Sequence, residues 1–189
     1  MRKKDDTLRE TLLDAARSIS DTEGIGAVNI RSIAKKAGIA AGTVYNYFSS
    51  KDDILLALTE EYWKQTLYEM NNTISAVSFC AQLQEIFIFL RNRISQSAGK
   101  LMNSLGSTGT AGQMRMLSMQ SELELIFISR MEQDPGLRTE IWDKTFTKEQ
   151  FAHFLMINIM LLLKEETPDF DFFLTLVKRL IYESELENR

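Results

Sequence analysis

Hydrogen-bonding side chains are concentrated in one short stretch, GTVYNYF at residues 42–48. Thr43, Tyr45, Asn46 and Tyr47 together supply three hydroxyls and one amide. Such groups bind phosphate oxygens and base edges, and an asparagine can make two hydrogen bonds to an adenine edge. Thr, Tyr and Asn are mediocre helix formers, and a helical glycine costs about 1 kcal/mol relative to alanine. We therefore interpret the stretch as a nucleic-acid contact surface; the alternative, that either tyrosine packs partly inside, stays open.

The charge distribution around this stretch is compatible with a polyanionic partner. Residues 1–51 contain nine Lys or Arg against six Asp or Glu, a net charge of +3, whereas the remainder of the chain carries −7. No acidic residue occurs between Glu23 and Asp52. Four cations fall within that interval, Arg31, Lys35, Lys36 and Lys51, and of these Arg31 and Lys51 are expected to contact DNA. Such a surface suits DNA, although a merely solvated helix face would show the same charges.

Three helices are predicted to position these groups. Apolar residues recur at helical spacing over 7–23, and Asn29 can cap a second helix over 30–37 by accepting from backbone N–H groups. Gly38 suits the left-handed turn that follows, and a third helix is expected over 41–48. Two short helices joined by a tight turn have the dimensions of a helix-turn-helix, in which the second helix enters the major groove.

The spacing within the third helix separates a buried face from an exposed one. Val44 and Phe48 are four residues apart and can both face the core, so that Thr43, Asn46 and Tyr47 turn outward. Gly42 has no side chain and would let the backbone approach a phosphate closely. Lys51, at the start of a fourth helix, is expected to extend its ammonium outward as a phosphate clamp. Arg2, Lys3 and Lys4 form either a DNA-contacting arm or a tail without contacts.

The stretch at residues 12–58 resembles the N-terminal DNA-binding domain of the tetracycline-repressor (TetR) family, through LLDAA at 12–16 and IAKKAGIAAGTVYNYFSSKDDIL at 33–55. The resemblance implies phosphate contacts at four positions: Asn29, Thr43, Tyr47 and Lys51. It places three others near bases: Ala41, Tyr45 and Asn46. Position 40 is often serine in the family, whereas Ala40 here cannot supply a hydroxyl cap, and Ala41 replaces a residue that is often polar.

Several classes of protein are disfavoured. The longest nearly apolar run, residues 151–163, is shorter than the ~20 residues that a membrane-spanning helix needs, and the basic N-terminus lacks the apolar stretch of a secretory signal. We therefore expect a cytoplasmic protein without membrane association. The single cysteine, Cys80, is interpreted as a buried, inert thiol. His153 is interpreted as a core or interface residue, and no catalytic pair, metal spacing or phosphate loop is evident, so no enzyme, metal or cofactor is expected.

The chain is predicted to be all-α, with a DNA-binding domain at 1–51, a connecting helix at 52–71 and a helical effector-binding and dimerisation domain at 72–189. Helices are expected over 79–94 and 113–132, with a Gly/Ser/Thr-rich break near 106–110. A capping box of Thr147 with Gln150 opens a helix over about 148–166. Thr167-Pro168-Asp169 should begin the last helix, with the proline at its first position, and that helix should run to about residue 186.

The last two helices are apolar over most of their surfaces, and a helix that is apolar on every side must be covered on every side. Paired terminal helices of two subunits can provide this cover, so we expect a homodimer, with a monomer as the alternative. The expected interface residues are Phe151, Phe154, Leu155, Ile159, Phe173, Leu176 and Leu180. Two recognition helices in such a dimer would read half-sites about 34 Å apart, or a multiple of that, on a pseudo-palindrome.

Methionine and aromatic residues of the C-terminal region suggest a pocket, because methionine adapts its shape to varied apolar ligands. The candidate lining residues are Phe87, Met102, Met114, Met119, Phe127 and Trp142, although methionines in helices are more often core filler. The predicted function is a repressor of transcription that releases its DNA operator when a small apolar or aromatic effector binds. The alternative is a ligand-independent regulator or an activator controlled by a protein partner.

Overall fold

The computed structural model describes residues 6–93 and 110–182, and describes side chains for 6–93 and 120–182. Every regular element in these ranges is helical, which confirms the all-α prediction. The chain divides into two compact units. Within the described ranges, residues 6–65 and 110–116 belong to the first unit, and residues 66–93 and 117–182 belong to the second.

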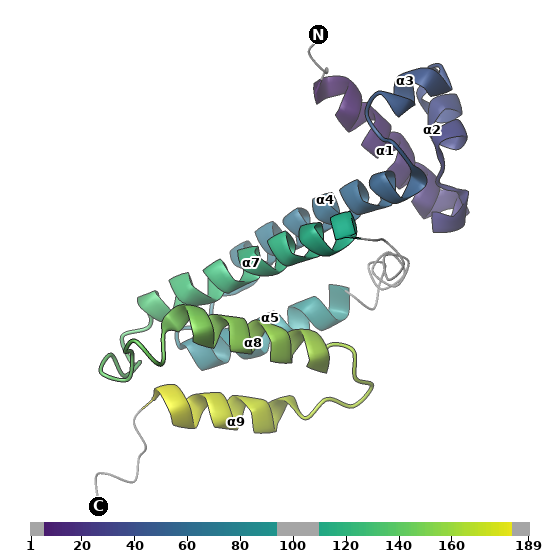
Figure 1. Ribbon diagram of the computed structural model, residues 1–189. Helices are drawn as coiled ribbons and strands as arrows, with labels where there is room; N and C mark the ends of the chain where they lie inside the picture. Colours follow the sequence, from purple (N-terminus) through teal and green to yellow (C-terminus); the bar gives the residue numbers. More distant parts are fainter. Residues whose placement is uncertain (1–5, 94–109, 183–189) are drawn as a thin grey trace, which may run out of the picture. The chain divides into compact units, whose positions relative to one another are not determined.

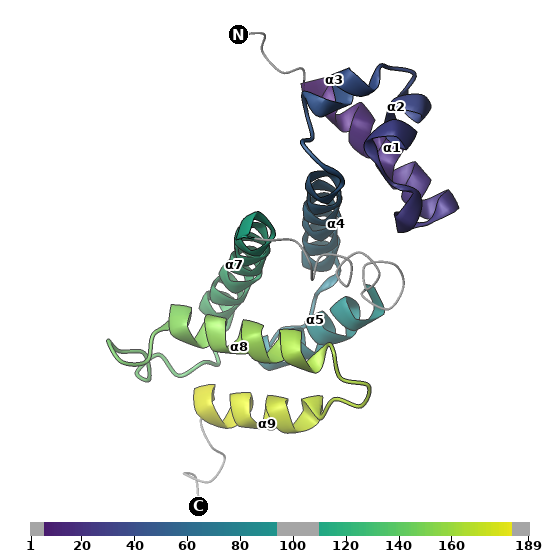
Figure 2. The ribbon, with the colours of Figure 1, turned by 45° about the vertical axis from the view of Figure 1, so that its right-hand side comes forward.

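The first unit contains a cluster of three helices, visible in two views (Figures 1 and 2). The unit contains α1 (Asp6–Glu23), the short 3-10 helix η1 (Ile25–Ala27), α2 (Ile30–Ala37) and α3 (Ala41–Tyr45), together with the first part of α4 (Lys51–Thr73) and the first residues of α7 (Thr110–Gln133). Ile19, Ile33 and Val44, one from each helix of the cluster, are at most 2% exposed. The unit extends beyond residue 51 because Ile54 and Leu58 of α4 are buried in the same core.

The second unit is built around aromatic contacts between helices. It contains the end of α4 together with α5 (Phe79–Arg93), most of α7 (Thr110–Gln133), α8 (Lys148–Leu162) and α9 (Phe170–Ile181). Phe87 of α5 stacks on Phe170 of α9, with ring centroids 3.9 Å apart. Phe79 of α5 meets Phe127 of α7 edge to face at 6.4 Å. Helices α8 and α9 lie side by side in both views (Figures 1 and 2).

Local capping signals set the starts of α8 and α9. The predicted capping box is confirmed, because Thr147 Oγ1 accepts from the Gln150 N–H while Gln150 Oε1 accepts from the Thr147 N–H. The expectation that Pro168 is the first helical residue of α9 is wrong. Asp169 is the cap, and its Oδ1 accepts from the Phe172 N–H at 3.0 Å. Pro168 therefore precedes the cap, and the helix ends at Ile181 because Tyr182 has extended backbone angles.

A buried carboxylate, Asp134, joins three segments of the second unit. Its Oδ2 accepts from the Phe79 N–H at the start of α5 and from the Tyr182 hydroxyl, while its Oδ1 accepts from the Gly136 N–H in the turn after α7. Burial alone raises the pKa of Asp134, but these three hydrogen bonds outweigh it, and the pKa lies below its ordinary value. The charged form is therefore the one that stabilises the fold.

Replacing this carboxylate should weaken the second unit in a pH-dependent way. We expect Asp134→Asn to lower the free energy of unfolding at pH 7 by about 2 kcal/mol, because an amide cannot accept from all three donors. A carboxyl whose folded-state pKa is lowered stabilises fully above its unfolded-state pKa. Its contribution is lost as the pH falls from about 4 through the folded-state value. Urea unfolding of wild type and Asp134→Asn between pH 7 and 3 should show that their difference in free energy of unfolding becomes smaller as the pH falls.

Asp143→Asn is the matched control, since Asp143 also accepts from two backbone N–H groups in a turn but is exposed. Its effect should be much smaller than that of Asp134→Asn. A difference between wild type and Asp134→Asn that stays constant with pH would contradict the role assigned to the carboxylate.

Two residues singled out in the sequence lie in the second unit. Cys80 is half-buried, and burial raises the pKa of its thiol to about 11, consistent with an inert group. His153 is not in the core: its side chain is 58% exposed, and its Nδ1 lies 2.7 Å from Glu124 Oε1. Across residues 6–93 and 110–182, no helix has the length and apolar character needed to cross a membrane. The same described residues contain no cluster of His, Cys, Asp or Glu suited to a metal ion.

Candidate nucleic-acid interface

The two short helices α2 and α3 are joined as a helix-turn-helix. Asn29 begins α2 as predicted, since its Oδ1 accepts from the N–H groups of Arg31 and Ser32 at 3.0 Å each. Gly38 ends the helix in the left-handed conformation, with φ 69°, and the Ile39 N–H closes the turn on the Ala34 carbonyl at 3.0 Å. This geometry fixes the direction in which α3 leaves the turn.

Two buried side chains, one in α3 and one just after it, pack this segment against the core of the unit. Val44 is fully buried and Phe48 is 2% exposed, which confirms the predicted inner face. The helix spans Ala41–Tyr45 and is therefore shorter than the expected range of 41–48. Ala40 occupies the cap position without a side-chain hydrogen bond, as expected from the missing hydroxyl.

The outer side of α3 carries the polar groups noted in the sequence. Gly42, Asn46 and Tyr45 are exposed, the tyrosine by 59%. Thr43 is half-buried, as is Ala41. Tyr47 is half-buried and packs against the core of the unit, which is the alternative left open for this residue. Tyr45 and Asn46 are thus the side chains most available to a partner.

Exposed cations lie on α2. Arg31 was predicted as a contact residue, and it is exposed together with Lys35 and Lys36. The two lysines were noted in the basic interval of the sequence but were not counted among the contact residues. Both lysines lie in the last turn of α2, where positive charge stabilises the helix by interacting with its dipole. They also add positive charge next to the turn that leads into α3.

Two predicted phosphate contacts have additional structural roles. Lys51 Nζ donates to the Gly26 carbonyl at 3.1 Å, so its ammonium does not extend freely outward as expected. The ammonium has three donors, and this bond uses one of them. Asn29 uses its Oδ1 to cap α2 and its Nδ2 to donate to the Ala27 carbonyl at 3.0 Å. Its side chain therefore fixes the start of α2, while the residue remains exposed.

Other predicted residues are only partly described. Arg2, Lys3, Lys4 and Met102 lie outside the described residues, as do the side chains of Met114 and Met119. Phe87 and Phe127 are buried in ring contacts, and Trp142 stacks on Phe146 at 5.3 Å. All three aromatic side chains therefore pack against other aromatic rings of the chain.

The predicted dimer residues fall into two groups. Four of them are buried within the single chain and belong to its core rather than its surface: Phe151, Leu155, Ile159 and Phe173. The others are exposed by 42% to 48%: Phe154, Leu176 and Leu180. Three further apolar residues of α8 and α9 are exposed by 41% to 59%: Ile157, Leu161 and Phe172. We call these six exposed residues the apolar face of α8 and α9.

Comparison with known proteins agrees with this geometry. Residues 12–58 match the family model described as bacterial regulatory proteins, tetR family. The chain is 38% identical over 63 residues to the Fatty acid metabolism regulator protein of Bacillus subtilis, covering 33% of this chain and 32% of that protein. It is 42% identical over 55 residues to the HTH-type transcriptional repressor KstR of Mycolicibacterium smegmatis, covering 29% and 27%. The matches thus span about a third of these relatives' length.

The fold resemblance extends over most of the chain. The solved structure of the transcriptional repressor QsdR from R. erythropolis, of the TetR family, superposes with a TM-score of 0.64. It covers 94% of this chain and 96% of that one, at 16% sequence identity. At this identity the resemblance establishes the fold of the chain.

Proposed function

We propose that the protein is a homodimeric, DNA-binding regulator of transcription in the cytoplasm, because residues 12–58 match the family model of bacterial regulatory proteins, tetR family. It represses its target genes by binding a pseudo-palindromic operator, and it leaves the DNA when a small-molecule effector binds the second unit. KstR and QsdR are both named as repressors, which supports this direction of control. The proteins compared above are regulators rather than enzymes.

The observation that carries the proposal is the construction of α3. Val44 and Phe48 are buried, so the helix is fixed to the unit, while Tyr45 and Asn46 are left exposed. Helix propensity does not favour either residue, whereas both can hydrogen-bond to base edges or phosphates. The carboxylate-free interval between Glu23 and Asp52 adds favourable electrostatics toward DNA.

The apolar face of α8 and α9 supports the dimer. Six large apolar side chains are exposed on two adjacent helices, and clustered apolar exposure is typical of protein–protein interfaces. A second copy of the chain would bury this face against its own equivalent by a two-fold axis. Two α3 helices would then read half-sites about 34 Å apart, or a multiple of that spacing.

Control by an effector is supported by a pocket of about 540 Å³ in the second unit. This volume lies within the range of small-molecule sites. An effector that binds one arrangement of the dimer more tightly than another shifts the balance between them and thereby changes DNA affinity. Control by a protein partner instead of a small molecule remains the alternative function.

The proposal is tested by fluorescence anisotropy with DNA from upstream of the protein's own gene and with random DNA of equal length. We expect tight binding to the upstream fragment that weakens steeply as salt increases, since phosphate contacts release counterions. Tyr45→Ala should weaken it by about tenfold, the value of one hydrogen bond to a charged group. Tyr68→Ala, which removes a tyrosine 68% exposed on α4, is the matched control and should bind as wild type. Equal binding by both variants would contradict the role of α3.

A further inference from the structure

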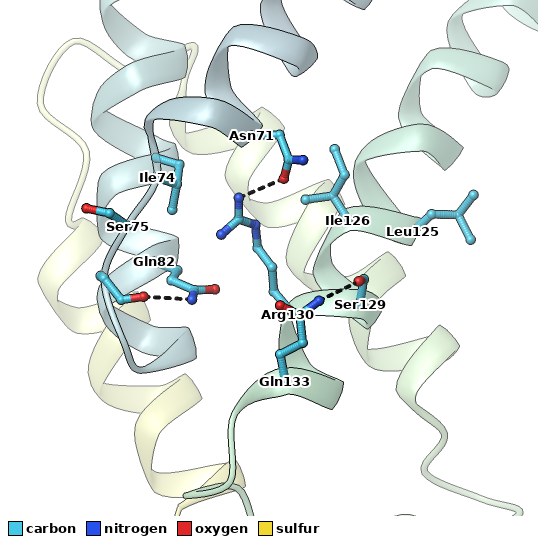
Figure 3. Close-up of a pocket in the computed structure, with 10 residues that line it drawn as sticks. Asn71, Ile74, Ser75, Gln82, Leu125, Ile126, Ser129, Arg130 and Gln133 are labelled. Carbon is cyan, nitrogen blue, oxygen red and sulfur yellow. Dashed lines mark hydrogen bonds between the residues drawn. The ribbon is translucent and has the colours of Figure 1, made fainter.

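A polar pocket in the second unit contains a buried cation (Figure 3). It is lined by Asn71 at the end of α4, by the connection to α5, by Gln82 of α5 and by the last turns of α7. The pocket is therefore distinct in composition from the set of methionine and aromatic residues predicted from the sequence. Its polar groups indicate the chemical class of ligand that it accepts.

Arg130 is the charged group of the pocket. It is 9% exposed, and its guanidinium extends from α7 to Asn71, where Nη2 donates to Oδ1 at 2.9 Å (Figure 3). Its Nε is buried and has no hydrogen-bond partner in the described part of the chain. A buried cation is costly unless an anion and hydrogen-bond acceptors surround it, and an amide oxygen supplies only one acceptor without charge.

The protein compensates this charge only in part. Glu85 attracts Arg130, but its Oε2 accepts from the N–H groups of Ser75 and Ala76 at 3.0 and 3.2 Å. Burial outweighs the attraction of Glu85, so that the pKa of Arg130 lies below its ordinary value. The guanidinium remains charged, because even a lowered arginine pKa stays far above neutrality. An additional anion in the pocket would therefore be favourable.

The remaining lining supplies an acceptor and apolar surface. Gln82 Nε2 donates to the Ala76 carbonyl at 2.7 Å, while its Oε1 is buried without a partner among the described residues. Ile74 and Ile126 also line the pocket. A ligand that satisfies this lining carries one negative charge, a hydrogen-bond donor and an apolar body.

We propose that this pocket binds the effector, and that the effector is a small organic monocarboxylate. The carboxylate pairs with the Arg130 guanidinium, whose planar donors match carboxylate geometry, and the apolar part contacts Ile74 and Ile126. A monoanion fits better than a phosphate, because Arg130 is the one cation among the lining residues. The assignment as effector rests on the proposed function, whereas binding of the carboxylate can be measured without DNA.

The test uses three carboxylates that also carry a hydroxyl donor for Gln82 Oε1: 6-hydroxyhexanoate, 8-hydroxyoctanoate and 4-(4-hydroxyphenyl)butyrate. Each is paired with its primary amide, and inorganic phosphate is tested alongside them. We expect at least one carboxylate to bind wild type by calorimetry and to raise its melting temperature. Its amide should bind at least about tenfold more weakly, since the charge-assisted pair with Arg130 is lost. Phosphate should not bind.

Two substitutions report on the pocket. Arg130→Met should weaken carboxylate binding by at least about tenfold, whereas Arg138→Met, which removes an arginine outside the pocket lining, should not. Gln82→Glu places a carboxylate in the same pocket and should also abolish binding, which keeps the test valid if Arg130→Met does not fold. The proposal is overturned if no carboxylate binds wild type, if amides or phosphate bind equally well, or if a folded pocket variant binds unchanged.

Anisotropy with operator DNA separates this inference from the proposed function. Release of DNA by a carboxylate in wild type but not in Arg130→Met supports both. Carboxylate binding that depends on Arg130 yet leaves DNA affinity unchanged supports the carboxylate site but overturns its role as the effector site. Release of DNA that persists in Arg130→Met overturns the site assignment and leaves the regulator proposal intact.

Discussion

Gly42→Asp is expected to leave the protein folded and to reduce its affinity for operator DNA by about 100-fold or more. Gly42 is exposed, its backbone does not have a positive φ, and a Cβ at this position would meet no atom within 4 Å. An acidic residue in the first turn of a helix is favourable, so stability should be unchanged or slightly higher. On DNA, the same carboxylate would face phosphates, and like charges in an interface cost several kcal/mol.

The measurement combines thermal unfolding with anisotropy at one salt concentration. Gly42→Ala separates size from charge: it should stabilise the protein by up to about 1 kcal/mol and weaken DNA binding less than aspartate does. Asn72→Asp makes the same change in net charge at an exposed position of α4 and should bind DNA as wild type. Normal DNA affinity in a folded Gly42→Asp protein would mean that α3 does not approach DNA as proposed.

If the chain forms the proposed dimer, Leu176→Glu is expected to convert it into a folded monomer. Leu176 lies on the apolar face of α8 and α9 and is 42% exposed in the single chain, so glutamate is tolerated there by the monomer. In the dimer it would be a buried, unpaired charge, which costs several kcal/mol. Light scattering should report half the mass of wild type. Operator affinity should fall by about 100-fold or more, because each half-site is then bound separately.

Val77→Glu is the matched control for this experiment. Val77 is 89% exposed between α4 and α5, outside the apolar face, and the variant should remain dimeric. If Leu176→Glu keeps the mass and DNA affinity of wild type, the subunits associate through some other surface or not at all.

Helix starts and ends were predictable where one or two neighbouring residues determine them. Helix α2 begins after Asn29 and ends before Gly38, as the sequence indicated, because a side-chain cap and a left-handed glycine act locally. The start of α9 was misjudged because Pro168 and Asp169 are both acceptable near a helix start. The observed cap depends on the hydrogen bond that Asp169 makes to Phe172.

Burial was harder to predict, because it depends on distant segments. Helix α8 has two apolar stripes, and periodicity alone does not tell which one faces the chain's own core. The structure buries Phe151 and Leu155 and exposes Phe154. Arg130 is a similar case. In the sequence it is an ordinary cation near the end of a helix, and only its contact with Asn71, 59 residues away, identifies a buried charge.

The most direct test of the account is a selection from random double-stranded DNA with the purified protein, followed by sequencing of the bound duplexes. We predict enrichment of an inverted repeat whose half-sites lie one or more helical turns apart, because in the proposed dimer two α3 helices would read DNA about a two-fold axis. Recovery of duplexes without a shared sequence motif would contradict the claim that this protein is a sequence-specific regulator of transcription.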